Sequence, residues 1–208
     1  MQNLTAFTIK KLLTLQADPE VLVVSQDEVH FTQRSTVAAR LVKRGSRPKV
    51  ASYPGRAKVS FSGFVELGVD KGRLFIASPE RFTWETTIAS IRGYLATLSP
   101  EDKRQIWMLL DNAPWHRKAK RLIREQTEYP DIRERVSFLD IPPYSPDLNP
   151  IEQVWRVARR EVTHNRFFPS IDEEKGKLEA WFAELATPNQ KLASLCTFQF
   201  KHEKQDHS

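Results

Sequence analysis

The sequence predicts an α/β fold in which helices flank a central, mixed, five-stranded sheet. Two observations support this prediction. Five short segments rich in β-branched and aromatic residues are bounded by turn-forming residues, as strands are. In the second half of the chain, such segments alternate with segments whose apolar residues recur at helical spacing. That alternation is typical of a sheet that has parallel neighbours and helices on its faces.

The predicted elements follow one another without an internal repeat or a low-complexity linker. The first strand is apolar on both faces at its start, as a buried central strand is. The next two strands form a hairpin that turns through residues 68–72. The predicted strands cover residues 21–31, 58–67, 73–77, 105–110 and 136–141, and the predicted helices cover residues 8–16, 83–98, 114–127, 149–164 and 171–186.

The composition is that of a globular protein in a reducing compartment. Apolar residues make up 40% of the 208 residues, but no apolar run is long enough to span a membrane. Lys10 and Lys11 interrupt the one segment that could serve as a signal peptide. The single cysteine, Cys196, excludes an internal disulfide, and no cluster of Cys and His residues suggests zinc. We therefore expect a cytoplasmic protein without a membrane partner.

The distribution of charge indicates a polyanionic partner. The net charge is +6, and few of the clustered cations have an acidic residue three or four positions away. The alternative is a mildly basic protein without such a partner. The clusters are Arg34, Arg40, Lys43, Arg44, Arg47, Lys49, Arg56 and Lys58; Arg117, Lys118, Lys120, Arg121 and Arg124; and Arg156, Arg159, Arg160 and Arg166.

Two aspartates stand where predicted strands end. Asp27 lies near the end of the first strand, and Asp111 directly follows the apolar run at residues 106–110. In open α/β sheets, functional sites gather at the carboxyl ends of strands. Each aspartate also has a structural explanation; for example, Asp111 and Asn112 suit a turn or a helix cap before Pro114.

Glu152 lies at the margin of a predicted amphipathic helix. It falls about 100° from the centre of the apolar face, and Arg156 and Arg159 continue along the same margin. A carboxylate there can reach a metal ion above the sheet edge, and the arginines can follow a phosphate backbone. We expect Asn149 to cap the helix. Glu152 could then alternatively complete a capping box, or it could pair with Arg156. We favour the metal-binding interpretation.

Three carboxylates suit metal-dependent cleavage of a phosphodiester bond. In-line displacement develops charge on the attacking and leaving oxygens, and two metal ions about 3.5–4 Å apart can stabilise both. Magnesium prefers oxygen ligands and keeps several waters, so a few carboxylates suffice. The lack of cysteine clusters and paired histidines argues against zinc. The residue types therefore indicate a magnesium site at Asp27, Asp111 and Glu152.

Three segments surround these carboxylates. They read SQDE at residues 25–28, LLDNAPWH at residues 109–116 and PPYSPDLNPIEQVW at residues 142–155. Together they strongly resemble the DDE transposases of the mariner-like superfamily, particularly its bacterial insertion-sequence branch. The third segment is very specific, the second is moderately specific, and the first is weak alone. The resemblance covers roughly residues 20–165.

The resemblance implies a ribonuclease H-like fold in which Asp27, Asp111 and Glu152 bind two Mg²⁺ ions, for which Mn²⁺ would substitute. The implied reaction is hydrolysis at transposon ends, followed by attack of the freed 3′ hydroxyl on target DNA. The implied partners are double-stranded DNA and a second copy of the chain. Asn112 and His116 are candidates for supporting the carboxylates. Asn112 could instead be a turn residue, and His116 a surface residue or a phosphate contact.

The resemblance also implies a catalytic domain over residues 21–186, followed by a C-terminal tail at residues 187–208. The family places a helix-turn-helix region before this domain, whereas residues 1–20 hold only a short helical segment. We therefore expect the DNA-recognition half to be separately encoded, as in a split element, or lost, as in a truncated relic. The forty residues between Asp111 and Glu152 are also more than is usual in the family.

Four basic residues are the candidates for contact with DNA phosphates: Arg117, Lys118, Arg156 and Arg159. We expect Trp155 to lie in the core. Two other functions remain open. A cellular nuclease would suit the ribonuclease H-like fold but not the third segment. An inactive DNA-binding remnant of a transposase would keep the basic surface without turnover.

Overall fold

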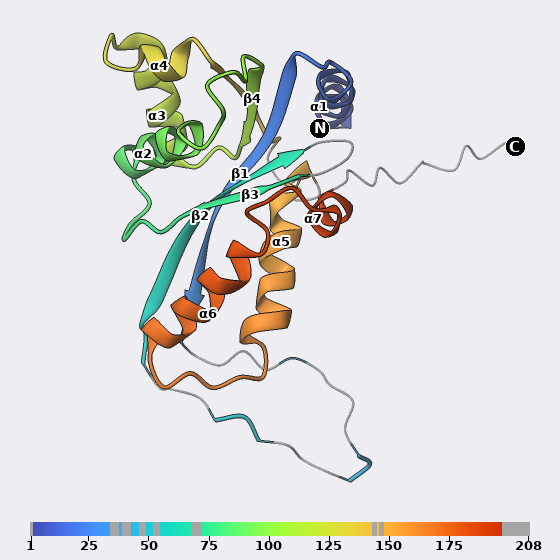
Figure 1. Cartoon of the computed structure of the whole chain (residues 1–208), viewed down its shortest axis with the longest axis vertical. Coiled ribbons are helices and arrows are strands. Elements are labelled where there is room, and N and C mark those ends of the chain that lie inside the picture. Colours follow the sequence, from blue (N-terminus) through green and yellow to red (C-terminus); the bar gives the residue numbers. More distant parts are fainter. Residues whose placement is uncertain are drawn as a thin grey trace, which may run out of the picture.

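The computed structural model describes residues 2–33, 38, 43–45, 49–51, 55–67, 72–142, 145 and 148–196. In this part of the chain, a central sheet lies between two groups of helices (Figure 1). The strands are β1 (Val21–Thr32), β2 (Lys58–Leu67), β3 (Leu74–Ala77), β4 (Gln105–Leu110) and β5 (Val136–Asp140). The helices are α1 (Gln2–Gln16), α2 (Trp84–Leu95), α3 (Pro114–Glu125), α4 (Pro130–Arg133), α5 (Ile151–Ala158), α6 (Ile171–Ala183) and α7 (Gln190–Leu195), with a π-helical segment, Arg159–Thr163, directly after α5.

The strands form one mixed sheet. Within the described residues, the strand order is β3-β2-β1-β4-β5. Strand β1 pairs with β2, and β2 with β3, in antiparallel fashion. Strand β1 pairs with β4, and β4 with β5, in parallel fashion. The mixed, five-stranded sheet predicted from the sequence is therefore confirmed for this part of the chain, and β1 is its central strand.

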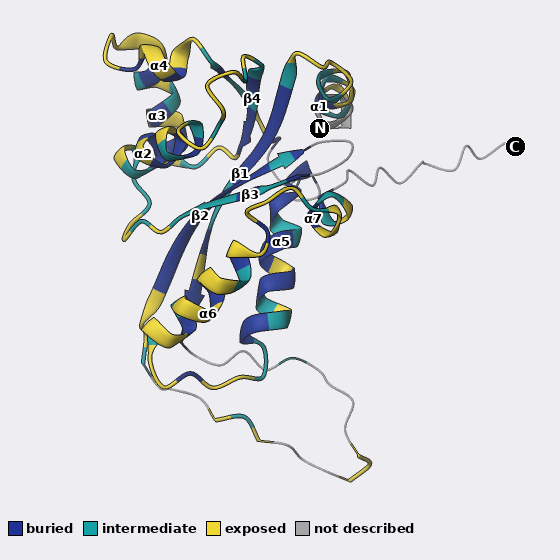
Figure 2. Cartoon of the chain, viewed as in Figure 1, coloured by how far each residue is buried: buried dark blue, intermediate teal, exposed yellow. Residues whose placement is uncertain are grey.

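Helices cover both faces of the sheet, and each face has its own apolar core. Helices α1, α5, α6 and α7 pack on one face, where Val23 and Leu109 are buried. Helices α2, α3 and α4 pack on the other, where Val24 and Leu110 are buried. Neighbouring residues of a strand thus point to opposite faces, as strand geometry requires. Figure 2 shows the buried sheet and the exposed outer surfaces of α4 and α6.

The parallel pairing of β1 with β4 positions the two predicted aspartates. The last paired residues are Ser25 and Leu109, and Asp27 and Asp111 each follow two positions later. Because side chains alternate along a strand, Asp27 belongs to the face that α5 covers, whereas Glu28 belongs to the face that α3 covers. The topology therefore places both aspartates beside the point where β4 ends.

The start of α5 differs from the capping alternative considered for this helix. The N-cap is Pro150, which makes no side-chain cap, and not Asn149. The Asn149 side chain instead accepts a hydrogen bond from the Ser25 hydroxyl, with 2.6 Å between Oδ1 and Oγ. The prediction that Asn149 caps this helix, in a capping box with Glu152, is therefore wrong. A tertiary hydrogen bond to β1 uses the oxygen that would have capped the helix.

Helix α7 lies in the segment predicted as a C-terminal tail. The Asn189 side chain accepts a hydrogen bond from the Leu192 N–H at 2.8 Å and so begins the helix. Leu192 is fully buried, and Cys196 belongs to the same apolar cluster on the α5 face. Residues 190–195 of this segment therefore contribute to the core.

Other elements depart from the predicted bounds. Helix α1 begins at Gln2 rather than at residue 8. The predicted helix at residues 149–164 continues from α5 into the π-helical segment, where the His164 N–H donates to the Arg159 carbonyl at 2.7 Å.

None of the helices in the described residues is long and apolar enough to cross a bilayer. Residues 68–71, much of the basic stretch between β1 and β2, and residues 197–208 lie outside the described residues.

Candidate functional site

Asp27 is held against helix α5. Its Oδ2 accepts a hydrogen bond from Trp155 Nε1 at 3.1 Å. Burial raises the pKa of Asp27 to about 7, and the charges of the neighbouring Glu28 and Glu152 carboxylates add to the rise. The side chain therefore gains and loses its proton near neutral pH, where a nearby cation can displace that proton.

Glu152 lies in the first turn of α5, close enough for its charge to raise the pKa of Asp27. The Glu152 backbone N–H donates to the Asn149 carbonyl at 3.1 Å. The Asn149 side chain is in turn bound to Ser25. The amino end of α5 is thereby fixed to the strand that holds Asp27. The structure thus brings the first and third predicted carboxylates within electrostatic range of each other.

Asp111 follows β4, and 51% of its side chain is exposed. Its Oδ1 accepts a hydrogen bond from the Ala113 N–H at 2.9 Å and lies 2.6 Å from His116 Nδ1. The hydrogen bond from His116 lowers the pKa of Asp111 and outweighs the opposing effect of burial. Asp111 therefore stays ionised and is oriented by the first turn of α3.

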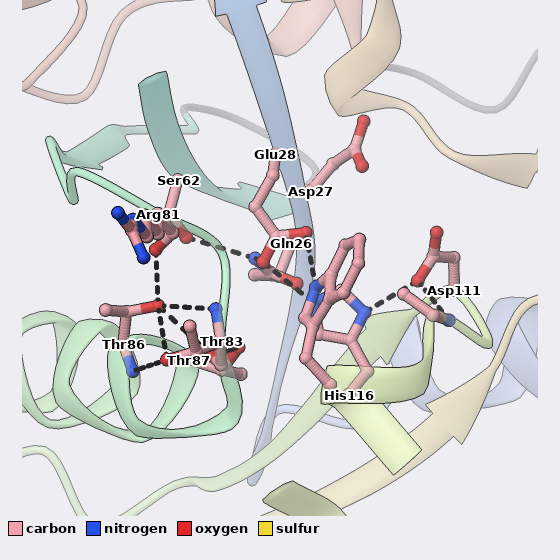
Figure 3. Close-up of polar contacts among 12 residues, drawn as sticks. Gln26, Asp27, Glu28, Ser62, Arg81, Thr83, Thr86, Thr87, Asp111 and His116 are labelled. Carbon is pink, nitrogen blue, oxygen red and sulfur yellow. Dashed lines mark hydrogen bonds and ion pairs between the residues drawn. The ribbon is translucent and has the colours of Figure 1, made fainter. Parts of the chain in front are cut away.

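His116 joins Asp111 to a further acidic residue, Glu28 (Figure 3). The imidazole is fully buried, and its Nε2 lies 2.8 Å from Glu28 Oε1. Burial alone would lower the pKa of His116, but the hydrogen bonds and charges of Asp111 and Glu28 outweigh it and raise the pKa to about 9. The ring is therefore an imidazolium at neutral pH and donates one hydrogen bond to each carboxylate.

The His116 side chain is wholly buried. The alternative that His116 is a surface residue is therefore wrong. Glu28 is a site residue that the sequence analysis missed. Its Oε1 accepts a hydrogen bond from Gln26 Nε2 at 3.1 Å, and its Oε2 accepts one from Trp115 Nε1 at 3.3 Å. The sequence could have pointed to Glu28, because it is a second acidic residue in a strand predicted to be buried on both faces. A buried carboxylate needs polar or charged partners.

Asn112 supports the loop between β4 and α3. Its Nδ2 donates a hydrogen bond to the Ile141 carbonyl at 3.2 Å. Ile141 directly follows β5, so this bond joins the carboxyl ends of two adjacent parallel strands. Asn112 therefore stabilises the backbone next to Asp111.

The oxygen atoms of the predicted ligands suit a hard divalent cation. The three predicted ligands, Asp27, Asp111 and Glu152, all offer carboxylate oxygens, which Mg²⁺ and Mn²⁺ prefer. The raised pKa of Asp27 reflects, in part, negative charge that a cation would compensate. Among the described residues, however, no three His, Cys, Asp or Glu side chains lie close enough together to hold an ion. Like charges repel, and a cation between these carboxylates would offset that repulsion.

The four basic candidates lie on helices at opposite faces of the sheet. Arg117 and Lys118 are exposed on α3, where they line an open hollow at the start of the helix. Arg156 is exposed on α5. Arg159 is half-buried, and its guanidinium lies 5.2 Å from the centre of the Phe31 ring. Arg159 is therefore held by a cation–π contact with the core, in addition to any role at the surface.

The chain is similar to known proteins. Residues 22–175 match the model of the DDE superfamily endonuclease family. The transposable element Tc3 transposase of Caenorhabditis elegans is 39% identical over 64 residues, which are 30% of this chain and 18% of the Tc3 protein. An uncharacterized protein of Sinorhizobium fredii, y4pE/y4sA, is 32% identical over 75 residues, which are 36% of this chain and 49% of that protein.

Solved structures of the Mos1 transposase have a similar fold. The Mos1 mariner paired-end complex with Mn has a TM-score of 0.60 and 18% identity, covering 91% of this chain and 56% of that chain. The Mos1 paired-end complex with the left transposon end has a TM-score of 0.59 and 17% identity, covering 94% and 55%. The fold is ribonuclease H-like, as the sequence resemblance implies. The chain spans about half the length of the Mos1 chains that it matches.

Proposed function

The chain belongs to the DDE superfamily endonuclease family, and we propose that it is the catalytic domain of a mariner-like transposase. In this proposal, the protein hydrolyses DNA strands at transposon ends and then joins the freed 3′ hydroxyl to target DNA. The placement of three carboxylates within the matched region supports it. Asp27 lies midway along β1, beside the point where its parallel neighbour β4 ends, and Asp111 directly follows β4. Glu152 lies in the first turn of the helix packed over Asp27.

We propose that Asp27, Asp111 and Glu152 hold two Mg²⁺ ions, for which Mn²⁺ can substitute. Mos1 structures named as complexes with Mn and with Mg support the use of a divalent metal ion. When bound, such ions stabilise the oxygens that gain charge as a phosphodiester bond breaks. Asp27 would hold such an ion in its ionised form, and its pKa of about 7 lets it lose its proton near neutral pH. His116 and Glu28 keep Asp111 ionised and in one orientation.

The proposed substrate is double-stranded DNA at the transposon ends and at the target. The Mos1 complexes named for paired ends and for a left transposon end support this substrate. We also propose that a homodimer is the active assembly. Arg117, Lys118 and Arg156 are exposed cations, and with Arg159 they would contact DNA phosphates. We further propose that a helix-turn-helix region recognises the ends, and that the protein acts on nucleoid DNA in the bacterial cytoplasm.

Strand cleavage with metal and cognate DNA tests this proposal. The purified chain with Mg²⁺ should cut or join strands of DNA that contains the terminal repeats of the element, and a chelator should stop the reaction. Labelled strands separated on a denaturing gel measure both products. Salt-sensitive DNA binding without metal-dependent cleavage would contradict the proposal and favour the inactive remnant. Cleavage without any joining of the freed 3′ hydroxyl to a target strand would indicate a cellular nuclease instead.

Salt dependence tests the proposed DNA surface on α3. Replacing Arg117 and Lys118 together with alanine should reduce the slope of log affinity against log salt concentration by about 2, because about one unit is lost for each phosphate contact. Fluorescence anisotropy with labelled duplex DNA measures the slope. The control removes two lysines on α6, Lys175 and Lys177, which lie outside the proposed surface. An unchanged slope in the α3 variant, or an equal change in the control, would reject this surface.

A further inference from the structure

The indole of Trp155 reaches from α5 to the carboxylate of Asp27. Only 3% of Trp155 is exposed, and its Nε1 donates a hydrogen bond to Asp27 Oδ2 at 3.1 Å. A core aromatic residue can pack its ring without such a contact, and phenylalanine would fill much of the same space. Packing alone therefore does not account for an N–H group directed at a proposed metal ligand.

Gly63 allows this close approach of the indole to the sheet. It pairs with Asp27 across strands β1 and β2. A β carbon at position 63 would lie 2.8 Å from both Trp155 Cζ2 and Ile151 Cδ1, so a larger residue would push the indole away. On its other side, the indole packs edge-on against Phe182, with 5.8 Å between the ring centres. The indole ring is thus fixed between β2 and α6, and its N–H points toward Asp27.

We propose that Trp155 is a positioning residue that orients Asp27 for metal binding, and that Gly63 makes its approach possible. This inference rests on the proposed function, because it takes Asp27 to be a metal ligand. Carboxylates that bind metals are usually oriented by hydrogen bonds from neighbouring groups, and losing such a partner typically lowers metal affinity about 10- to 100-fold. His116 has the corresponding contact with Asp111. Each proposed aspartate ligand thus has one oxygen bound by a ring N–H from a helix.

The variant Trp155→Phe tests this inference because it keeps an aromatic ring in the core and removes the N–H. We expect it to weaken Mn²⁺ binding by the full chain about tenfold or more, as measured by the electron paramagnetic resonance signal of free Mn²⁺. Trp181→Phe is the matched control, since Trp181 Nε1 donates to a different carboxylate, Glu161 Oε2, at 2.9 Å. The control should bind Mn²⁺ as the wild type does. Wild-type affinity in Trp155→Phe would overturn the inference.

A second measurement uses the wild-type chain and so does not depend on how the variant folds. With 5-fluorotryptophan incorporated, substoichiometric Mn²⁺ should broaden the fluorine resonance of Trp155 well before that of Trp181, because paramagnetic broadening falls steeply with distance. Equal broadening of the two resonances would overturn the inference. Failure of the proposed function would look different: the wild-type chain would bind no Mn²⁺ at all, and both proposals would then fall.

Discussion

Asp111→Asn should reduce metal-dependent DNA cleavage at least about 1,000-fold, which corresponds to about 4 kcal/mol of transition-state stabilisation. Asparagine has nearly the same shape as aspartate, and its amide oxygen can still accept hydrogen bonds from the Ala113 N–H and from His116. The variant therefore removes the negative charge that the proposed site offers to a metal ion and preserves the local fold. Single-turnover cleavage of a labelled transposon-end duplex measures the effect.

Asp140 provides the matched control for this prediction. It lies at the end of β5, pairs with Leu110 in the parallel register of β4 and β5, and forms an ion pair with Lys120. Asp140→Asn removes the same charge from the neighbouring strand end and should leave the cleavage rate nearly unchanged. A rate for Asp111→Asn within about tenfold of the wild type would reject Asp111 as a ligand. An equal loss of cleavage rate in both variants would show that the overall negative charge at these strand ends matters, and not metal binding by Asp111.

The sheet could be predicted because its pattern is local. Each strand shows its own apolar segment and turn signals, and the burial of β1 on both faces follows from the apolar residues at its start. Once β1 and β4 are parallel neighbours, Asp27 and Asp111 must lie near each other. Helix α7 was missed because six residues are too few to show a helical period.

The network around His116 could not be predicted from the sequence. The contact between His116 and Glu28 joins residues that are 88 positions apart, and it depends on how α3 is rotated over the sheet. Asn149 illustrates the same limit. Its local sequence suits a helix cap, but the Ser25 hydroxyl, 124 positions away, binds its side chain instead. Local preference is worth about 1 kcal/mol at a cap, and a buried tertiary hydrogen bond can offset it.

His116→Leu should have the largest effect on stability, lowering the free energy of unfolding by about 3 kcal/mol. Leucine is apolar and of comparable size, so the space stays filled. Glu28, however, has only 7% of its side chain exposed and would lose its cationic partner. A buried carboxylate without a counter-charge is costly, so the loss should exceed that of an ordinary core substitution. Urea denaturation at pH 7 with a chelator present measures the difference without a contribution from bound metal.

The pH dependence of stability separates this charge effect from simple packing. The folded protein holds the His116 proton up to about pH 9, whereas the unfolded chain releases it near the ordinary value of 6.5. The stabilisation is therefore fully present below pH 6.5 and is lost as the pH rises through 9, by roughly 3 kcal/mol in the wild type. His116→Leu should remove most of this decline and leave only the smaller part that comes from groups with a folded pKa near 7, such as Asp27. His30→Leu, which removes an exposed histidine from β1, the strand that carries Glu28, should retain the decline. A wild-type free energy of unfolding that stays constant between pH 6.5 and 9 would show that His116 is neutral in the folded protein, and that Glu28 is stabilised by its neutral donors alone.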